Sequence, residues 1–449
     1  MKAIAYTALR LFEDAAKKET VTKHLSRLRK MRQEDPEALR SYQFTAVKKL
    51  LEYAYENTRF YRQRMVDQGV HPGDIRSLED FSRLKPVTRE DIQCRGQELL
   101  SRKFEAGNLT RGSSSGSTGE PITFYQDKGA LSAGRAAVLM GWELAGKRMG
   151  DKVITLWGNR DTIRHSWSKP GSRLKAMLYR DLRIPVDRLV QESEFKEILA
   201  VMRRRGGGYV FGYSHPIYLL ACYAKEHGIP FERKFDGILT TAEKLYPKHR
   251  EIVEEVFGPV CDCYGSREIL GIAYQCRERK GYHIIEPNLI FEKEPFMEDR
   301  EEIVVTDLWN YGWPLIRYKI SDLVTGEFRS CTCGCTWKTI DTIVGRTSEI
   351  IRLPGGGLLH PMAWFVEAFG KHWTKMKQIQ FARVAVNKCI LRARLYEGQD
   401  ASFLQEIKKA MSDHLKGIME FDVEVVESFP PSPTGKHRSV VDETVKRTQ

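Results

Sequence analysis

Hydrophobic and polar residues alternate with a helical period at the start of the chain. Over residues 1–70, Leu, Ala, Val and Tyr recur at steps of three and four between charged residues, as in KKLLEYAYENTRFYRQRM. This spacing predicts amphipathic helices, each with one apolar face. The pattern breaks at residues 70–74, where His71, Pro72 and Gly73 indicate a linker. We therefore expect a helical N-terminal segment over residues 1–70.

After the linker the pattern changes to short apolar runs separated by helical stretches. The runs are VITLW at 153–157, YVFGY at 209–213, GILTT at 237–241 and EIVVTDL at 302–308. Continuous β-branched and aromatic runs are typical of buried strands, and their alternation with helices predicts an α/β domain with mixed sheets and flanking helices. Residues 347–449 mix β-like and helical stretches, which favours a small α+β domain. We expect the segment 1–70 to pack on a large domain at 71–346.

Length and composition agree with this organisation. A chain of 449 residues is too long for one compact core, since single cores stop growing at roughly 250–300 residues. A hydrophobic content of 41% excludes an intrinsically disordered protein. No apolar run approaches the roughly 18 residues that span a bilayer, and Glu13 and Asp14 stand where a signal peptide would be apolar. We therefore expect a cytoplasmic protein.

The charge is unevenly distributed along the chain. The 72 Lys and Arg residues exceed the 59 Asp and Glu residues by 13, and residues 1–50 hold 12 basic against 6 acidic residues. Such a segment suits nucleic acid, or an anionic membrane with Ile4, Leu9, Leu11 and Phe12 as an apolar stripe. It also suits a solvated helix on an enzyme with anionic substrates. We adopt this last interpretation, which needs no specific nucleic acid, and leave peripheral membrane association and a homodimer open.

Four segments carry candidate chemistry, and the first is a run of Ser, Thr and Gly at residues 112–121, before the strand-like ITFYQ. Glycines let backbone N–H groups turn toward a polyphosphate, and the hydroxyls add further donors. The run is not a Walker loop, because it lacks the Gly-Lys-Ser/Thr ending and precedes a strand. Its composition also fits a flexible linker.

The other three segments offer carboxylates and a lysine. A tight turn over Asp262–Glu268 would present Tyr264 to a purine and Glu268 to Mg²⁺, although a surface loop with an ion pair has the same composition. Asp322, in IRYKISD, could accept hydrogen bonds from ribose hydroxyls. Near the end of the chain, Gly435 lets Lys436 project from a turn.

In this order the four segments resemble those of the acyl-adenylate-forming enzymes, and within them the phenylacetate-coenzyme A ligases and their CapK-like relatives in capsular polysaccharide biosynthesis. The resemblance extends over nearly the whole chain. It implies that ATP activates a carboxylic acid, that pyrophosphate leaves, and that the acyl group of the acyl-adenylate passes to coenzyme A. An amine or amino sugar is an alternative acceptor. A catalytically degenerate protein that binds nucleic acid or a membrane is a further alternative.

The resemblance also implies roles for individual residues. The loop 114–119 would close over the β- and γ-phosphates, residues 241–243 would line the adenine, and Asp262 would bind its amino group. Glu268 would hold Mg²⁺, and Lys436, on a mobile lid at 347–449, would be catalytic. The implied ATP-binding residues are Ser114, Ser115, Gly116, Ser117, Thr118, Gly119, Thr241, Ala242, Glu243, Asp262, Tyr264, Gly265, Asp322 and Arg346.

The sequence departs from the family pattern at three positions. Ser321 replaces a glycine before the ribose aspartate, Glu120 replaces a lysine after the phosphate loop, and Ser348 replaces an aspartate near the expected hinge. None of these changes removes a group that the chemistry requires.

The cysteines suggest a metal site separate from the nucleotide. Cys331 and Cys333 are one residue apart next to a glycine, which is a common half of a tetrahedral zinc site, while Cys276 and His283 lie across a turn upstream. Some relatives share this pattern, which implies a structural Cys₃His zinc. Cys335 is a plausible substitute ligand, and Cys261 and Cys263 fit the core better. Reduced cysteines packed as small apolar residues are the alternative.

The acid-binding pocket has the weakest signal. Trp157, His165 and Tyr213 could line it, because they lie in or near apolar runs that predict strands. Aromatic residues next to such runs are more often part of the core. We therefore keep these three residues as candidates.

Overall fold

The computed structural model describes residues 2–114, 122–158, 170–186, 192–297, 300–346, 351–352, 358–359, 375–415, 418–429 and 440–444. These residues form two compact units, with the break between Ile343 and Val344. The structure has mixed sheets and flanking helices, as expected. None of the helices in the described ranges is long and apolar enough to cross a membrane.

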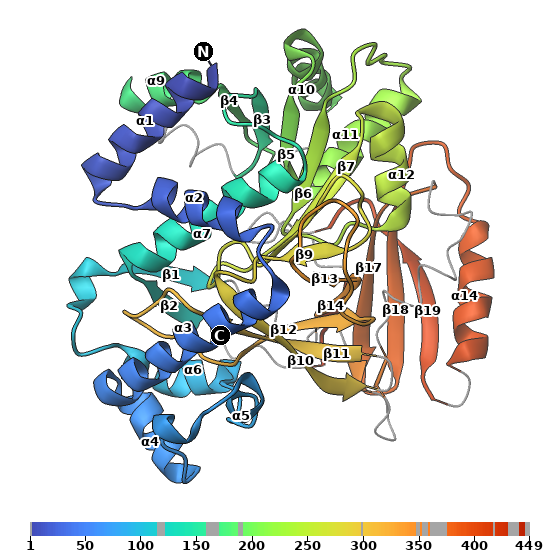
Figure 1. Cartoon of the computed structure of the whole chain (residues 1–449). Coiled ribbons are helices and arrows are strands. Elements are labelled where there is room, and N and C mark those ends of the chain that lie inside the picture. Colours follow the sequence, from blue (N-terminus) through green and yellow to red (C-terminus); the bar gives the residue numbers. More distant parts are fainter. Residues whose placement is uncertain are drawn as a thin grey trace. The chain divides into compact units, whose positions relative to one another are not determined.

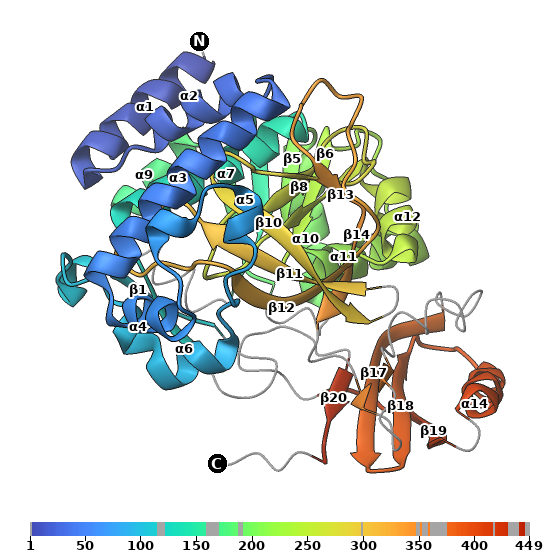
Figure 2. The ribbon, with the colours of Figure 1, turned by 60° about the horizontal axis from the view of Figure 1, so that its bottom comes forward.

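The first unit begins with helices, which confirms the amphipathic pattern. Asp35 accepts hydrogen bonds from the backbone N–H groups of Glu37 and Ala38 and so caps the third helix. Figures 1 and 2 show the first two helices side by side. The helical elements before the first strand are α1 (Lys2–Lys17), α2 (Val21–Met31), α3 (Pro36–Asn57), α4 (Arg59–Asp67), η1 (Pro72–Asp74), α5 (Leu78–Phe81), α6 (Arg89–Arg95), η2 (Gly96–Leu99) and η3 (Ala106–Asn108).

An eight-stranded sheet forms the centre of the first unit, in the order β13-β9-β8-β7-β6-β5-β3-β4. The strands from β7 to β4 in this order are parallel, and β8, β9 and β13 continue the sheet antiparallel. The strands are β3 (Val153–Leu156), β4 (Asp181–Ile184), β5 (Tyr209–Tyr213), β6 (Gly237–Thr241), β7 (Val260–Tyr264), β8 (Ala273–Gln275), β9 (Tyr282–Ile284) and β13 (Thr339–Ile340).

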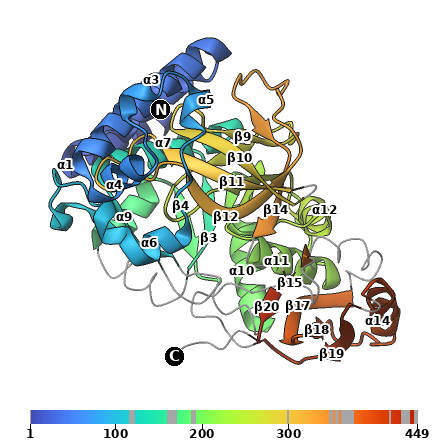
Figure 3. The ribbon, with the colours of Figure 1, turned by 90° about the horizontal axis from the view of Figure 1, so that it is seen from below.

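Helices cover both faces of this sheet (Figure 3). On one face, α7 (Lys128–Leu144) and α2 bury Met140, Leu25 and Leu28 against Leu239 and Cys261 of the strands. On the other face, α11 packs on β5 and β6, and α12 packs on β7. The helices that follow β3 are α9 (Pro170–Leu178), α10 (Glu192–Arg205), α11 (Ser214–Glu226) and α12 (Pro247–Val256).

A second, four-stranded sheet has the order β10-β11-β12-β14, and a separate hairpin joins β1 to β2. In the hairpin, Gly112 pairs with Phe124, and a Cβ at Gly112 would lie 2.2 Å from the Phe124 ring. This glycine is therefore required by packing. The strands are β1 (Thr110–Ser114), β2 (Ile122–Gln126), β10 (Leu289–Met297), β11 (Arg300–Asp307), β12 (Tyr318–Thr325) and β14 (Thr342–Arg346).

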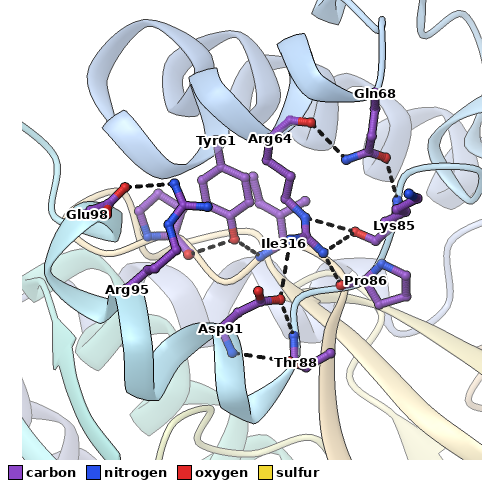
Figure 4. A network of polar contacts seen from close by, with 11 residues as sticks. Tyr61, Arg64, Gln68, Lys85, Pro86, Thr88, Asp91, Arg95, Glu98 and Ile316 are labelled. Carbon is purple, nitrogen blue, oxygen red and sulfur yellow. Dashed lines mark hydrogen bonds and ion pairs between the residues drawn. The ribbon is translucent and has the colours of Figure 1, made fainter.

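Polar contacts fix the segment that leads into β12 against the N-terminal helices (Figure 4). The Tyr61 hydroxyl donates to the Pro314 carbonyl over 3.1 Å and accepts from the Ile316 N–H over 2.9 Å. Arg64 donates to the carbonyls of Lys85 and Pro86 and pairs with Asp91 at 3.3 Å. The start of β12 is thus held by side chains from helices that precede every nucleotide motif.

The second unit is a small α+β body. Its main sheet has the order β19-β18-β17-β20, and α14 packs on β19 (Figure 2). Phe381 and Phe421 stack at 5.8 Å in its core. Its elements are β15 (Ile351–Arg352), β16 (Leu358–Leu359), β17 (Met376–Ala385), β18 (Lys388–Leu395), α14 (Phe403–His414), β19 (Glu420–Val425) and β20 (Val440–Asp442).

Candidate functional site

Four parallel strands end at one edge of the large sheet. Because β3, β5, β6 and β7 are parallel, their carboxyl ends meet at this edge, where ligands of open α/β sheets bind. Trp157 follows β3, Tyr213 ends β5, Thr241 ends β6 and Tyr264 ends β7. The sheet therefore brings together residues that lie more than a hundred positions apart in the sequence.

Aromatic rings stack at the carboxyl ends of β3 and β5. The Trp157 ring lies 4.3 Å from that of Tyr213 and 5.6 Å from that of Phe211, almost parallel to the latter. Phe211 was not among the candidate residues of the sequence analysis. Side chains two residues apart on a strand share a face, so its position relative to Tyr213 was the available signal. His165, the third pocket candidate, lies outside the described residues.

Tyr264 and Asp322 join the two sheets of the first unit. The Tyr264 hydroxyl donates to Oδ2 of Asp322 over 2.8 Å. Opposite Asp322 the pairing of β11 with β12 shifts, because Glu302 pairs with Leu323 while Val304 pairs with Lys319. Such a bulge bends its strand and redirects the side chains on it.

Ser321 has a backbone φ of +68°, in the left-handed region that glycine adopts without strain. The position before Asp322 is therefore one that the local geometry favours for glycine. This geometry is a physical reason for the glycine that the resemblance implies at this position. The serine keeps the bulge, at a conformational cost of about 1 kcal/mol.

Glu268 lies in the turn that follows β7. The turn is closed by the Ser266 N–H, which donates to the Ile269 carbonyl, and by the Ile272 N–H, which donates to the Tyr264 carbonyl. Glu268 as a whole residue is only 7% exposed, and no group among the described residues donates to its carboxylate. Its carboxylate oxygens therefore remain available to a cation.

Asp262 lies inside the sheet. We expected it to begin a turn, but β7 continues to Tyr264, so Asp262 is a strand residue. Its two oxygens accept hydrogen bonds from the hydroxyls of Thr240, over 2.6 Å, and Tyr282, over 2.7 Å. Burial raises the pKa of Asp262, although both hydroxyl contacts act against this rise. The strand continues because Cys261 and Cys263 face the core beneath α7.

The turn after β6 is held by its own glutamate. Ala242 has a φ of +67°, and Oε2 of Glu243 accepts a hydrogen bond from the His215 N–H over 3.0 Å. The Ser214 hydroxyl donates to the Glu243 carbonyl over 3.0 Å. Glu243 thus caps the start of α11 and orients the turn that carries Thr241 and Ala242.

The remaining candidates are less completely described. Ser114 ends β1 and its backbone pairs with Ile122, so the phosphate-loop candidates 115–119 fall in the connection of the β1–β2 hairpin. Residues 115–121 and Lys436 lie outside the described residues. Gly265 is exposed directly after β7, and Arg346 ends β14 on the second unit.

Cys276, His283, Cys331 and Cys333 form a cluster in which all four ligand atoms lie within 4.8 Å of one another. The sulfurs of Cys276 and Cys331 are 3.7 Å apart, close to the separation of about 3.8 Å expected for two sulfurs on a tetrahedral zinc. Cys333 Sγ lies 3.3 Å from His283 Nε2, and His283 Nδ1 lies 3.2 Å from the Trp337 carbonyl. Donation from Nδ1 to this carbonyl leaves Nε2 for a metal.

The fold explains why these residues converge. Cys276 follows β8 and His283 lies in β9, while β13 pairs His283 with Thr339 and so folds the loop that carries Cys331 and Cys333 onto the hairpin. Cys335 is buried outside the four-residue cluster. Cys261 and Cys263 lie in the core beneath α7, as expected.

The sequence has relatives among ligases, although no model of a known protein family matches it. It is 27% identical over 333 residues to the phenylacetate-coenzyme A ligase of Thermus thermophilus, which covers 71% of this chain and 73% of that protein. It is 24% identical to the phenylacetate-coenzyme A ligase of Pseudomonas putida over 71% of this chain and 73% of that protein. It is 22% identical to Protein CapK of Staphylococcus aureus over 87% and 86%.

The fold is also that of a solved adenylate-forming ligase. The structure superposes on 2-hydroxyisobutyryl-CoA ligase, solved in the postadenylation state, with a TM-score of 0.71 over 92% of this chain and 91% of that one, at 18% identity. The sequence relatives and this common fold confirm the resemblance seen in the four segments. Over most of its length the chain is thus similar to the phenylacetate-coenzyme A ligases and to CapK, and its fold is that of an adenylate-forming ligase.

Proposed function

We propose that the protein is an ATP-dependent, AMP-forming acid ligase. A substrate carboxylate attacks the α-phosphorus of ATP, and the bond from this phosphorus to the oxygen that bridges to the β-phosphate breaks. Pyrophosphate departs, and the acyl-adenylate is formed. The thiol of coenzyme A then attacks the acyl carbonyl, and AMP leaves. The phenylacetate-coenzyme A ligases among its relatives support coenzyme A as the acceptor.

The observation that carries this proposal is the hydrogen bond from Tyr264 to Asp322, together with the Glu268 carboxylate, which no described group contacts, in the turn after Tyr264. The phenolic hydroxyl of Tyr264 orients the Asp322 carboxylate, which would accept hydrogen bonds from ribose hydroxyls. Glu268, in the turn after Tyr264, would hold Mg²⁺. When bound, this ion would offset the negative charge of the phosphates.

Other residues would position the remaining parts of ATP and the acid. Residues 114–119 would donate to the β- and γ-phosphates, and Thr241 and Ala242, oriented by Glu243, would line the adenine. The stack of Trp157, Phe211 and Tyr213 would form an apolar wall for the acid. Arg346 and Lys436 would bring positive charge to the ribose side and to the α-phosphate.

An amine or amino sugar is a second candidate acceptor. The CapK relative matches a larger share of this chain than the phenylacetate-coenzyme A ligases do. The fold itself leaves the acceptor open, because the structure also superposes on an amide bond synthetase, McbA, with a TM-score of 0.50 at 14% identity.

The test is ATP–pyrophosphate exchange with a panel of carboxylic acids, followed by competition between coenzyme A and amines. At least one acid should support exchange. A folded protein that exchanges with no acid would instead be a degenerate binding protein.

Lys436→Ala separates the two half-reactions. Loss of a cation at the α-phosphate should lower exchange by about 10²–10³, while a supplied acyl-adenylate should still be converted at close to the normal rate. Lys388→Ala, on a strand of the same unit, is the matched control and should leave both rates unchanged. An equal fall of both half-reactions in folded Lys436→Ala would contradict the assignment of Lys436 to adenylation.

We also propose a structural zinc bound by Cys276, His283, Cys331 and Cys333. The 3.7 Å separation of two sulfurs and the orientation of His283 by the Trp337 carbonyl support it. Zinc would tie the β8–β9 hairpin to the loop before β13 and would contribute folding free energy directly.

Metal analysis of protein purified without chelators should find about one zinc per chain. Cys331→Ser should lose the metal and melt at a lower temperature. Cys335→Ala, which removes a buried sulfur outside the cluster, should keep the metal. If Cys331→Ser kept the zinc and Cys335→Ala lost it, Cys335 would be the zinc ligand in place of Cys331.

A further inference from the structure

A cavity of about 530 Å³ lies at the amino ends of the parallel strands, at the edge of the large sheet opposite the nucleotide candidates. Tyr209 begins β5, Gly237 begins β6 and Cys261 is the second residue of β7, and all three line the cavity. Its volume falls within the range of roughly 300–1,000 Å³ that is typical of small-molecule sites. None of the described nucleotide-site candidates lines it, so this space is distinct from the nucleotide edge.

Three arginines from two segments line this cavity. Arg148 follows α7, while Arg277 and Arg279 lie in the connection from β8 to β9. Arg277 packs against Gly146, two residues before Arg148, because a Cβ at Gly146, whose φ is +93°, would lie 1.9 Å from Nε of Arg277. The glycine thus leaves the space in which the two segments meet. Arg279 forms an ion pair with Glu254, so Arg148 and Arg277 are the two arginines to consider.

No described carboxylate pairs with either of these two arginines. Arg277 donates only to uncharged oxygens, the Gly146 carbonyl and the Tyr209 hydroxyl, each over 3.5 Å. The guanidinium group of Arg148 has no ion pair within the described ranges, and both side chains are exposed at the rim of the cavity. A guanidinium group presents several N–H donors that fit the oxygens of a phosphate. The cavity therefore offers two guanidinium groups to an external anion.

Two carboxylates line the same cavity and restrict which anion it can hold. Oδ2 of Asp151 accepts a hydrogen bond from the Arg148 N–H over 2.7 Å, and Oδ2 of Asp236 accepts one from the Gly208 N–H over 2.9 Å. No described group donates to the second oxygen of either carboxylate. These oxygens would repel a bare polyanion but would accept hydrogen bonds from hydroxyl groups.

We infer that this cavity binds a small molecule that carries both a phosphate and hydroxyl groups, of the sugar phosphate class. Arg148 and Arg277 bind the phosphate, and Asp151 and Asp236 accept from the hydroxyls. The ring of Tyr209 in the floor provides an apolar surface for the carbon skeleton. The inference does not depend on the reaction that the enzyme catalyses, because it uses no residue of the nucleotide edge.

The experiment is isothermal titration calorimetry of the full chain with ribose 5-phosphate, inorganic phosphate and ribose. The wild-type protein should bind ribose 5-phosphate more tightly than either of the other two. Arg148→Gln and Arg277→Gln should each weaken this binding at least about tenfold, because each removes charge-assisted hydrogen bonds to the phosphate. Asp236→Asn should weaken ribose 5-phosphate about three- to tenfold, since a hydroxyl loses its acceptor. The same variant should bind inorganic phosphate more tightly, because a repelling charge is removed.

Arg204→Gln is the matched control, because Arg204 is an exposed arginine in the last turn of α10 that does not line the cavity. It should bind ribose 5-phosphate as the wild type does, and all variants should keep the wild-type melting temperature and ATP–pyrophosphate exchange.

Three results would overturn the inference. The first is absence of ribose 5-phosphate binding by the wild type, and the second is an equal loss in Arg204→Gln and Arg277→Gln. The third is ribose 5-phosphate that ATP displaces and that Arg277→Gln binds normally, because the sugar phosphate would then lie at the nucleotide edge. Equal affinities for inorganic phosphate and ribose 5-phosphate would overturn the assignment of a hydroxylated ligand.

Discussion

Asp262 and Glu268 lie six positions apart in the sequence, and both are buried, at 8% and 7% exposure. Their carboxylates have opposite surroundings. Asp262 accepts hydrogen bonds from Thr240 and Tyr282, whereas no described group donates to Glu268. Burial and sequence position therefore do not distinguish a carboxylate that supports the fold from one that is available to a ligand. The two kinds of carboxylate are distinguished by whether neighbouring groups donate hydrogen bonds to them.

This difference suggests a division of work at the nucleotide edge. Asp262 joins β6, β7 and β9 through its two hydroxyl contacts, so replacement of Asp262 should mainly lower the free energy of unfolding. Glu268 lacks such partners, so replacement of Glu268 should mainly lower the rate of catalysis.

The largest effect is expected for Glu268→Gln. Removal of the charge should lower ATP–pyrophosphate exchange by about 10²–10³, or about 3–4 kcal/mol, because a buried anion that balances a cation in the transition state is lost. The melting temperature should stay the same, because no described group donates to the carboxylate that is replaced. Glu232→Gln, at an exposed position, is the control. A stability loss in Glu268→Gln with normal exchange would reverse the roles.

Asp262→Ala should have the next largest effect, on stability. Two hydroxyls, of Thr240 and Tyr282, would lose their acceptor in a buried site, at a cost of about 1–3 kcal/mol in the free energy of unfolding. Tyr282→Phe should also destabilise, and the double variant should lose less than the sum. Chemical denaturation measures these differences. A raised KM for ATP in a fully stable Asp262→Ala protein would instead favour the adenine-binding role.

The pH dependence of stability should distinguish Asp262 from its neutral isostere. Because burial raises the pKa of Asp262, its contribution to stability is complete below the pKa of the unfolded chain and declines as pH rises through the folded-state pKa. Asp262→Asn removes this dependence. The stability of the wild type relative to Asp262→Asn should therefore fall as pH rises from 4 upward, measured by urea denaturation. A constant difference would contradict the raised pKa.

The smallest effect is expected at Ser321. Ser321→Gly should stabilise the protein by up to about 1 kcal/mol, because glycine adopts a positive φ without strain. Ser321→Ala keeps the strain and should bring no gain. Thermal unfolding measures both. A loss of exchange in Ser321→Gly would show that the serine hydroxyl, and not only the backbone, acts at Asp322.

The sequence was sufficient for the strands whose side chains face a core on both sides. Tyr209–Tyr213 and Gly237–Thr241 are strands over the same residues that the apolar runs indicated. The helices before residue 70 followed equally from their spacing. Local pattern is informative here because burial and secondary structure are determined by neighbouring residues.

Features that depend on distant contacts were harder to obtain. Asp262 looked like a turn residue, since its partners Thr240 and Tyr282 lie on other strands. The N-terminal segment looked like a solvated basic helix, whereas α2 is buried beneath α7 and α1 shows an apolar face. The sequence indicated Cys276, His283, Cys331 and Cys333 as a candidate set because each pair is close in sequence, and the pairing of β13 with β9 is what brings the two pairs together.

The loop that carries Cys331 and Cys333 also closes over the end of α2. The Trp337 indole donates to the Met31 carbonyl over 3.0 Å, and the Thr336 hydroxyl donates to the Glu34 carbonyl over 2.8 Å. The last carbonyls of a helix otherwise need water or a cap. With a metal in the cluster, metal binding by Cys331 and Cys333 would thus limit the unwinding of the C-terminal end of α2, which lies some three hundred residues earlier in the chain. Oxidation of these cysteines or loss of the metal would then loosen the end of α2, although neither change involves the nucleotide.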